Sequence, residues 1–91
     1  MYRIIVTAEV EDAKKWEKGF RTHGDLFRDQ TITALHFTVT KQNEACLYIE
    51  CDDADTYFKL MDSDATAKAM KFDGVKRETV KIYQLDKVFD L

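Results

Sequence analysis

The stretch that decides the fold spans residues 63–85 and reads SDATAKAMKFDGVKRETVKIYQL. Ser63 can cap a helix that ends near residues 70–72. Gly74 follows that end, and Val75 begins the return to the sheet. The residue just past a helix often takes a left-handed backbone, which only glycine adopts freely. Because the chain has three glycines and no proline, a glycine here predicts a helix end followed by a strand over 76–88.

The segment before this helix predicts a further helical piece. Asp52 or Asp53 can cap it. Asp62, Ser63 and Asp64 then interrupt it before the next piece begins. Apolar residues recur at the i, i+3, i+4 and i+7 spacing of an amphipathic helix, at Ala54, Tyr57, Phe58 and Met61.

Two alternating runs, 31–41 and 45–51, predict a hairpin joined by the polar turn 41–44. Asn43 suits that turn because asparagine tolerates a left-handed backbone. Alternation divides the first run into Thr33, Leu35, Phe37 and Val39 on one face and Ile32, Ala34, His36 and Thr38 on the other. It divides the second run into Ala45, Leu47, Ile49 and Cys51 against Cys46, Tyr48 and Glu50.

The N-terminal part predicts a strand over 2–10 and then a helix capped by Asp12. Gly19 and Gly24 indicate close packing within this helix or a break near Gly24. The whole order is β-α-β-β-α-β, which predicts an α+β, ferredoxin-like domain over 1–91. We expect a four-stranded antiparallel sheet with the helices on one face. The apolar residues with helical spacing are Ala13, Trp16, Phe20 and Phe27.

Composition excludes several classes of function. Apolar residues form 45% of the chain and charged residues 34%, as in a globular domain. The net charge is −3, from 14 basic and 17 acidic side chains. Nucleic acid is therefore not an expected partner, because phosphate binding needs a concentrated basic surface. No apolar run is long enough for a membrane span.

The chain carries no recognisable signal peptide, since Met1 leads directly into the first strand. Cys46 and Cys51 are five residues apart in one strand and face opposite sides, so they cannot pair within it. Both features favour a cytoplasmic protein with reduced thiols.

Two helices can cover only one face of this sheet. The other face, here called the open face, mixes apolar and charged residues and predicts a partner. A second copy of the chain, docked through the sheet to form a homodimer, is the simplest partner. The open face is Arg3, Ile5, Thr7, Ala34, His36, Thr38, Cys46, Tyr48, Glu50, Thr79, Lys81, Tyr83 and Leu85. The covered face is Ile4, Val6, Leu35, Phe37, Val39, Leu47, Ile49, Val80 and Ile82.

Several segments together resemble the dimeric α/β-barrel superfamily, which includes antibiotic-biosynthesis-monooxygenase-like proteins. They are VEDAKKWEKGF (10–20), with Trp16 and Phe20, then His23, Arg28, the Asp52–Asp53 pair, and SDATAKAMKFDGV (63–75). The resemblance spans most of the chain and rests mainly on structural motifs.

The resemblance implies a dimer whose sheets face each other, with a pocket between sheet and helices in each protomer. Members oxidise phenolic polyketides without a cofactor, degrade haem, or isomerise and cyclise small molecules, and many have no known reaction. This chain has Gln30 and Thr31 where relatives often carry a glycine after the Arg28 position. No haem-degrading residue set matches, so we expect no cofactor.

The candidate catalytic residues are His36, Tyr48 and Glu50. His36 can act as a base near neutral pH, or it can simply hydrogen-bond at a dimer interface. Tyr48 can bind an anionic intermediate or pack across the sheet, and Glu50 is either a base or an ion-pair partner of Arg3 or Lys81. The candidate ligand-pocket residues are Trp16, Phe20, His23 and Tyr83.

Stronger catalytic signatures are missing from the sequence. It holds no nucleophile elbow, phosphate-binding glycine loop, HExxH or CxxC motif, and we expect no metal. Two functions stay open. The leading one is non-catalytic binding or interaction through the sheet face, with a small molecule as a second ligand. The other is a cofactor-independent, monooxygenase-like or isomerase-like enzyme for a small aromatic or enolisable molecule, with His36 as base.

Overall fold

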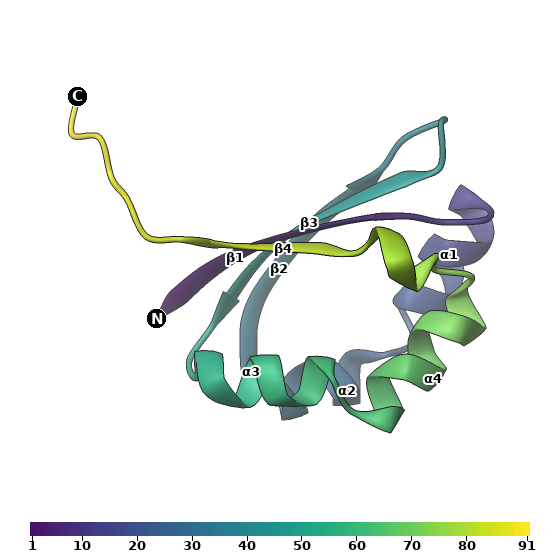
Figure 1. Cartoon of the computed structure of the whole chain (residues 1–91), viewed down its shortest axis with the longest axis horizontal. Coiled ribbons are helices and arrows are strands. Elements are labelled where there is room, and N and C mark those ends of the chain that lie inside the picture. The colour runs from purple at the N-terminus through teal and green to yellow at the C-terminus, as the bar shows by residue number, and fades with distance from the viewer.

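A computed structural model describes all 91 residues. Four antiparallel strands form one sheet in the order β2-β3-β1-β4, and the helices lie together on one side of it (Figure 1). The predicted α+β, ferredoxin-like fold is confirmed. The elements are β1 (Tyr2–Glu9), α1 (Ala13–Phe20), α2 (Gly24–Asp29), β2 (Ile32–Val39), β3 (Glu44–Cys51), α3 (Ala54–Met61), α4 (Asp64–Asp73), the 3-10 turn η1 (Arg77–Thr79) and β4 (Lys81–Leu85).

Both helical regions are divided into two short helices, and α1, α3 and α4 begin at predicted caps. The Asp12 carboxylate accepts a hydrogen bond from the Lys15 amide at 3.0 Å, and Ser63 Oγ accepts one from the Thr66 amide at 3.3 Å. Asp53 caps α3 in the same way. The predicted break near Gly24 is also confirmed, because α1 ends at Phe20 and α2 starts at Gly24. These caps satisfy backbone N–H groups that a helix start leaves free.

Gly74 ends α4 with φ of +76°, as predicted. The Gly74 amide donates to the Lys71 carbonyl at 3.2 Å, and the Val75 amide donates to the Met70 carbonyl at 2.9 Å. This pair of bonds is the Schellman motif. The Glu11 amide then donates to the Gly74 carbonyl at 2.9 Å, so the end of α4 is held against the chain that leaves β1.

The last strand is shorter than predicted, because β4 covers 81–85 rather than 76–88. Residues 77–79 form a 3-10 turn instead. Thr79 explains the difference. Its hydroxyl accepts a hydrogen bond from the Glu9 amide at 2.8 Å and donates to the Lys76 carbonyl at 2.6 Å. A side chain therefore takes the place of a ladder bond in the sheet.

A second correction concerns the face of the sheet on which the Ile32 side chain lies. Strict alternation places Ile32 on the open face, but it packs against the core beneath the helices. The pairing of β2 with β3 shifts between Ile32 and Ala34, which leaves Thr33 as a β-bulge. One extra residue in a strand reverses the facing of the residues before it.

The core lies between the sheet and the helices, and it contains two groups of buried residues. Ile4, Val6, Ile49, Cys51 and Tyr57 form the first. Val10, Trp16, Phe20 and Ala45 form the second. The predicted covered face is therefore confirmed.

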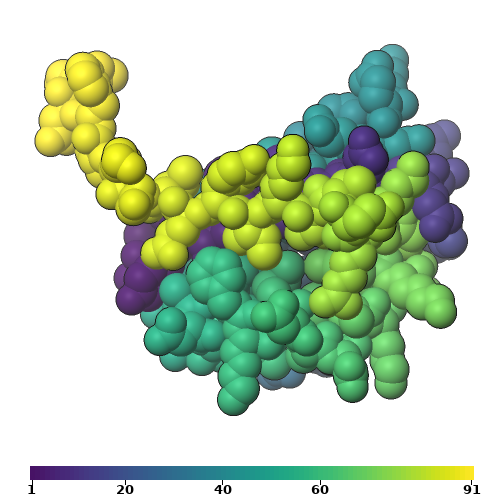
Figure 2. All heavy atoms as spheres, in the orientation of Figure 1, coloured from purple at the N-terminus to yellow at the C-terminus, as the bar shows by residue number.

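Both cysteines are free thiols on opposite faces of β3, also as predicted. Residues after Leu85 extend away from the body of the domain (Figures 1 and 2). Their Val88, Phe89 and Leu91 side chains are exposed. No helix is long and apolar enough to cross a bilayer.

Candidate functional site

A cavity of about 80 Å³ lies between the sheet and the helices. Of its 18 lining residues, 16 are hydrophobic, so its walls favour an apolar ligand. The sheet contributes Val6, Leu47 and Ile49, and the helices contribute Trp16 and Tyr57 among others.

Part of the cavity wall is a cluster of aromatic rings. The rings of Trp16 and Phe20 stack with their centroids 4.6 Å apart, and Phe20 lies 4.9 Å from Phe27. Phe37 of β2 meets the Trp16 ring edge-on at 5.6 Å. Trp16, Phe20 and Phe27 recur at helical spacing along α1 and α2, so one face of the two helices turns its rings toward the sheet. Trp16 and Phe20, two of the candidate pocket residues, therefore lie in the cavity wall.

Two methionines, Met61 and Met70, also line the cavity. A cavity of roughly 150 Å³ holds a benzene ring, which is about twice the volume here. An aromatic ligand therefore has to displace side chains. Methionine yields readily because it is unbranched and flexible, so Met61 and Met70 are the lining residues at which the cavity can enlarge.

Only two lining residues are polar, Gln30 and Asp73. The side-chain N–H group of Gln30 is used within the fold, because it donates to Thr66 Oγ1 at 3.2 Å. Thr66 Oγ1 in turn donates to the Leu60 carbonyl at 2.6 Å. Gln30 thus links the end of α2 to the junction of α3 and α4.

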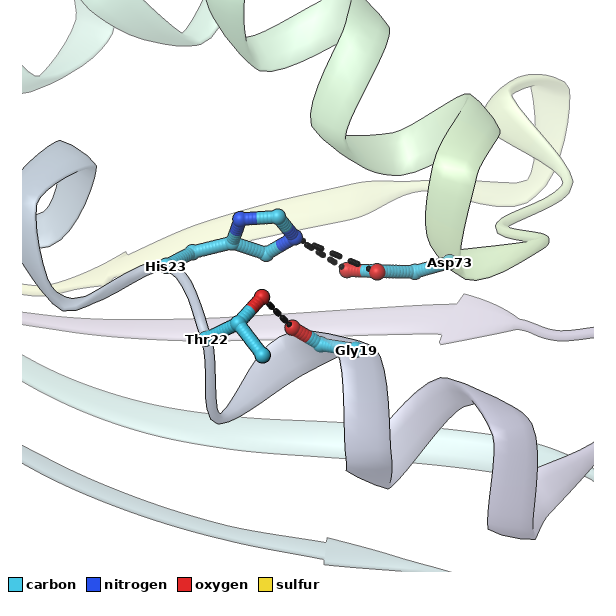
Figure 3. A network of polar contacts seen from close by, with 4 residues as sticks. All are labelled: Gly19, Thr22, His23 and Asp73. Atoms are coloured by element: carbon cyan, nitrogen blue, oxygen red, sulfur yellow. Dashed lines mark hydrogen bonds and ion pairs between the residues drawn. The ribbon is translucent and has the colours of Figure 1, made fainter.

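Asp73, the last residue of α4, pairs with His23 in the link between α1 and α2. The ring of His23 points at the carboxylate (Figure 3), and its Nε2 lies 2.9 Å from Oδ2 and 3.1 Å from Oδ1. The Asp73 side chain is 4% exposed and the His23 side chain is 19% exposed. The pair joins two segments 50 residues apart in the chain and places the carboxylate in the cavity wall.

Gly19 makes room for this pair. A side chain at Gly19 would collide with Asp73 Oδ1, and its Cβ would lie 3.0 Å from Asp73 Cγ. The Gly19 carbonyl accepts a 2.6 Å hydrogen bond from Thr22 Oγ1, which folds the chain toward His23 (Figure 3). A glycine in a helix costs about 1 kcal/mol relative to alanine, so the close approach of Asp73 explains its presence.

The electrostatic setting of Asp73 is unfavourable to its charge. Burial raises the pKa of the Asp73 carboxyl, and the hydrogen bond and positive charge of His23, with a smaller effect of Lys15, offset this only in part. The carboxylate also lies at the negative end of the α4 dipole. Perturbed acids that line a cavity often belong to functional sites.

The remaining candidate residues lie on the open face. His36, Tyr48, Ile5 and Tyr83 are direct cross-strand neighbours and form one row across all four strands. The rings of His36 and Tyr48 meet edge-on with their centroids 6.1 Å apart. Tyr48 donates to Glu50 Oε2 at 3.0 Å, and Arg3 of β1 lies opposite Glu50. His36 is exposed.

The structure thus divides the predicted site residues between two places. His36, Tyr48, Glu50 and Tyr83 share the open face. Trp16 and Phe20 line the cavity on the other side of the sheet, and His23 lies beside the cavity as the partner of Asp73. Sequence reasoning did not name Asp73, and it noted Gln30 only as a departure from relatives and not as a site residue. The available signals for Asp73 were a glycine within a helix at position 19 and an acidic residue at the end of a helix.

Comparisons with known proteins bear on the fold. No family model matches the sequence, and no curated protein matches it. Among solved structures, an antibiotic biosynthesis monooxygenase is similar with a TM-score of 0.70 at 12% identity, covering 97% of this chain and 99% of that one. SnoaB, a cofactor-independent oxygenase from Streptomyces nogalater, has a TM-score of 0.71 at 12% identity, covering 99% and 95%.

An Arabidopsis thaliana protein is similar over its whole length as well. Its TM-score is 0.68 at 9% identity, covering 100% of this chain and 99% of that one. Identities this low show a shared fold and not a shared activity. The resemblance to antibiotic-biosynthesis-monooxygenase-like proteins is therefore confirmed at the level of the fold.

Proposed function

We propose that this domain binds a small, mostly apolar molecule in the cavity between sheet and helices, and that it forms a homodimer through the open face. The observation that carries the binding function is the cavity lining, which is apolar except for Gln30 and Asp73. Ligand sites combine apolar walls with a few polar groups in this way.

The homodimer is supported by the row of Tyr48, Ile5 and Tyr83 on the open face. Tyr83 is 52% exposed although it lies in a strand, and Leu85 beside it is also exposed. Tyrosine is enriched at interfaces because its ring is apolar and its hydroxyl is polar. A stable pair buries about 800 Å² per protomer, which a four-stranded sheet face can supply. In this arrangement His36 and Glu50 are interface residues.

The binding proposal is tested by NMR titration with toluene, an apolar ring without hydrogen-bonding groups. We expect shifts at the Trp16 indole and the Leu47 and Val75 amides, which line the cavity, and none at Tyr48 or Tyr83. Ala69→Leu places a larger side chain in the wall and should remove binding. Ala65→Leu, at an exposed position on the same helix, is the matched control. Toluene shifts confined to the open face would contradict the proposal.

The dimer is tested by light scattering at micromolar concentration. We expect twice the mass of 10.6 kDa for the native chain. Ile5→Lys places a charge in the middle of the row and should yield monomers, because an unpaired charge in a packed interface is strongly unfavourable. Lys68→Glu on the exposed side of α4 is the control and should stay dimeric. A native monomer would contradict the homodimer.

A cofactor-independent enzyme is the second candidate function. Two observations favour it: the fold is shared with SnoaB, a cofactor-independent oxygenase, and the cavity wall contains Asp73, which is paired with His23 just outside the wall. A carboxylate and an imidazole are suited to proton abstraction from a phenolic or enolisable molecule. His36 remains the alternative base for a ligand held between the two sheets of a dimer. Turnover lost in Asp73→Asn but retained in His36→Ala would assign the chemistry to the cavity.

A further inference from the structure

We propose that Asp73 is the polar anchor of the cavity and accepts a hydrogen bond from an uncharged O–H or N–H group on the bound molecule, with His23 as its positioning residue. The inference rests on the proposed binding function and adds to it the residue that recognises the ligand and the kind of group recognised.

The first argument is acceptor capacity. An ionised carboxylate offers about four acceptor sites on its two oxygens. His23 Nε2 is the one side-chain donor on Asp73, and it is shared between both oxygens. Gln30, the other polar lining residue, uses its amide N–H on Thr66, and its remaining acceptor is a neutral carbonyl oxygen. Asp73 is therefore the lining group that offers a ligand a charged acceptor, and hydrogen bonds to charged groups are the stronger ones.

The second argument is the stability that the fold gives up at this position. Asp73 is buried, stands at the negative end of α4, and needs a helical glycine at position 19 to make room. An apolar residue would avoid the first two costs. Residues that break local rules in this way are concentrated at functional sites.

The third argument concerns the charge of the ligand. The titratable groups that face Asp73 are His23, from the link between α1 and α2, and Lys15 on α1. Both are basic groups, so they compensate the carboxylate and disfavour a cationic ligand. An anionic ligand would meet the carboxylate itself in a wall that is otherwise apolar. A neutral donor avoids both penalties.

His23 acts through Asp73, because Asp73 lines the cavity and His23 does not. The imidazole is held in place by Phe27 and Phe72, whose rings meet it nearly perpendicularly with centroids 6.3 Å away in each case. The contact of Nε2 with both oxygens then fixes the rotation of the carboxylate.

The test compares phenol with toluene, which have the same shape and differ in one donor. NMR titration gives both affinities, and their ratio is measured for the native chain, for Asp73→Asn and for the control Asp62→Asn at an exposed carboxylate. A hydrogen bond to a charged group is worth about tenfold in affinity or more. We expect the phenol preference to fall about tenfold in Asp73→Asn and to stay unchanged in Asp62→Asn.

A second measurement needs no change at Asp73. Protonation removes the acceptor charge, so the phenol preference of the native chain should fall as the pH drops through the raised pKa of Asp73. His23→Gln keeps an N–H donor but removes the positive charge that lowers this pKa, so the fall should begin at a higher pH. A purely structural role of His23 would leave the position of this step unchanged.

The possible outcomes distinguish failure of the anchor role of Asp73 from failure of the proposed binding function. If neither phenol nor toluene binds in the cavity, the binding function and the inference both fail. If both bind but the phenol preference is independent of pH and of Asp73→Asn, only the anchor role of Asp73 is overturned. A pH step that appears in the native chain and moves in His23→Gln supports the anchor even if Asp73→Asn does not fold.

Discussion

The two faces of the sheet are made by the same strands yet carry different chemistry. In β3, Ile49 lies beneath the helices and is 2% exposed, whereas its neighbour Tyr48 lies on the open face and hydrogen-bonds to Glu50. The covered face surrounds a cavity whose one carboxylate is Asp73. The open face distributes charged and aromatic residues over a broad surface. The comparison separates a surface suited to enclosing a ligand from one suited to a second protein.

The two histidines show what this difference means for a side chain. His36 is exposed and meets only the ring of Tyr48 among aromatic or charged groups. His23 is largely buried and bound to a carboxylate in a cavity wall. Sequence alternation made His36 the leading candidate base. The His23 ring is instead fixed against the buried Asp73 carboxylate, so this pair is better placed than His36 to hold a proton at a defined position.

The largest expected effect contrasts Ile49 with Tyr48 on adjacent positions of β3. Ile49→Ala removes fully buried methyl groups and should lower the free energy of unfolding by about 2–5 kcal/mol. Tyr48→Ala should lower that of the monomer by about 1 kcal/mol, from loss of its ring contact, and should weaken the dimer more. Urea unfolding at protein concentrations below the dimer range measures both. Equal losses would mean that the faces are not distinct in the monomer.

The second prediction compares Gly19 in α1 with Gly24 in α2. Gly19→Ala should destabilise by about 1–3 kcal/mol, because its methyl group overpacks the Asp73 carboxylate. At Gly24 the nearest atom to an added Cβ is the flexible Arg28 side chain at 3.6 Å. Gly24→Ala should therefore change stability by only about 0.5 kcal/mol. Thermal melts of both variants decide this, and equal shifts would show that Asp73 does not approach Gly19 closely.

The third prediction concerns the end of α4, which determines where Asp73 lies. Gly74→Ala should cost about 1 kcal/mol, because a side chain is disfavoured at the φ of +76° seen here. Gly74→Asn should cost less, since asparagine tolerates the left-handed region. The melting temperatures of the two variants test the order. An unchanged melting temperature for Gly74→Ala would contradict the left-handed helix end.

Local chemistry was enough to predict most of the fold. The caps at Asp12, Asp53 and Ser63 and the stop at Gly74 each depend on residues close in sequence, so they could be identified from the chain alone. The β-bulge at Thr33 and the shortened β4 could not, because each involves a bond to a distant strand. The Thr79 hydroxyl bonds the Glu9 amide 70 residues away, and nothing near Thr79 in the sequence indicates that partner.

The sequence pointed to the apolar part of the site and to His23, but not to the Asp73 carboxylate that His23 contacts. Helical spacing identified Trp16 and Phe20, because a repeated apolar position along a helix indicates the side that packs inward. The Asp73–His23 pair depends on how α4 docks beside α1, which no local pattern specifies. Gly19 was a partial signal: a glycine within a helix indicated close packing but not which residue approached it.

The smallest expected effect on stability is that of His36→Ala. This substitution tests the role of the open face of the sheet. The His36 side chain is exposed and touches the Tyr48 ring only edge-on, so its loss should change monomer stability by about 0.5 kcal/mol or less. His23→Ala removes the one side-chain donor on buried Asp73 and should cost about 1–3 kcal/mol. Urea unfolding gives both values, and light scattering shows whether His36→Ala weakens the dimer. A weakened dimer with normal toluene binding would make His36 an interface residue. Lost ligand binding in an intact dimer would instead place a ligand site between the two sheets, and would move the function from the covered face to the open one.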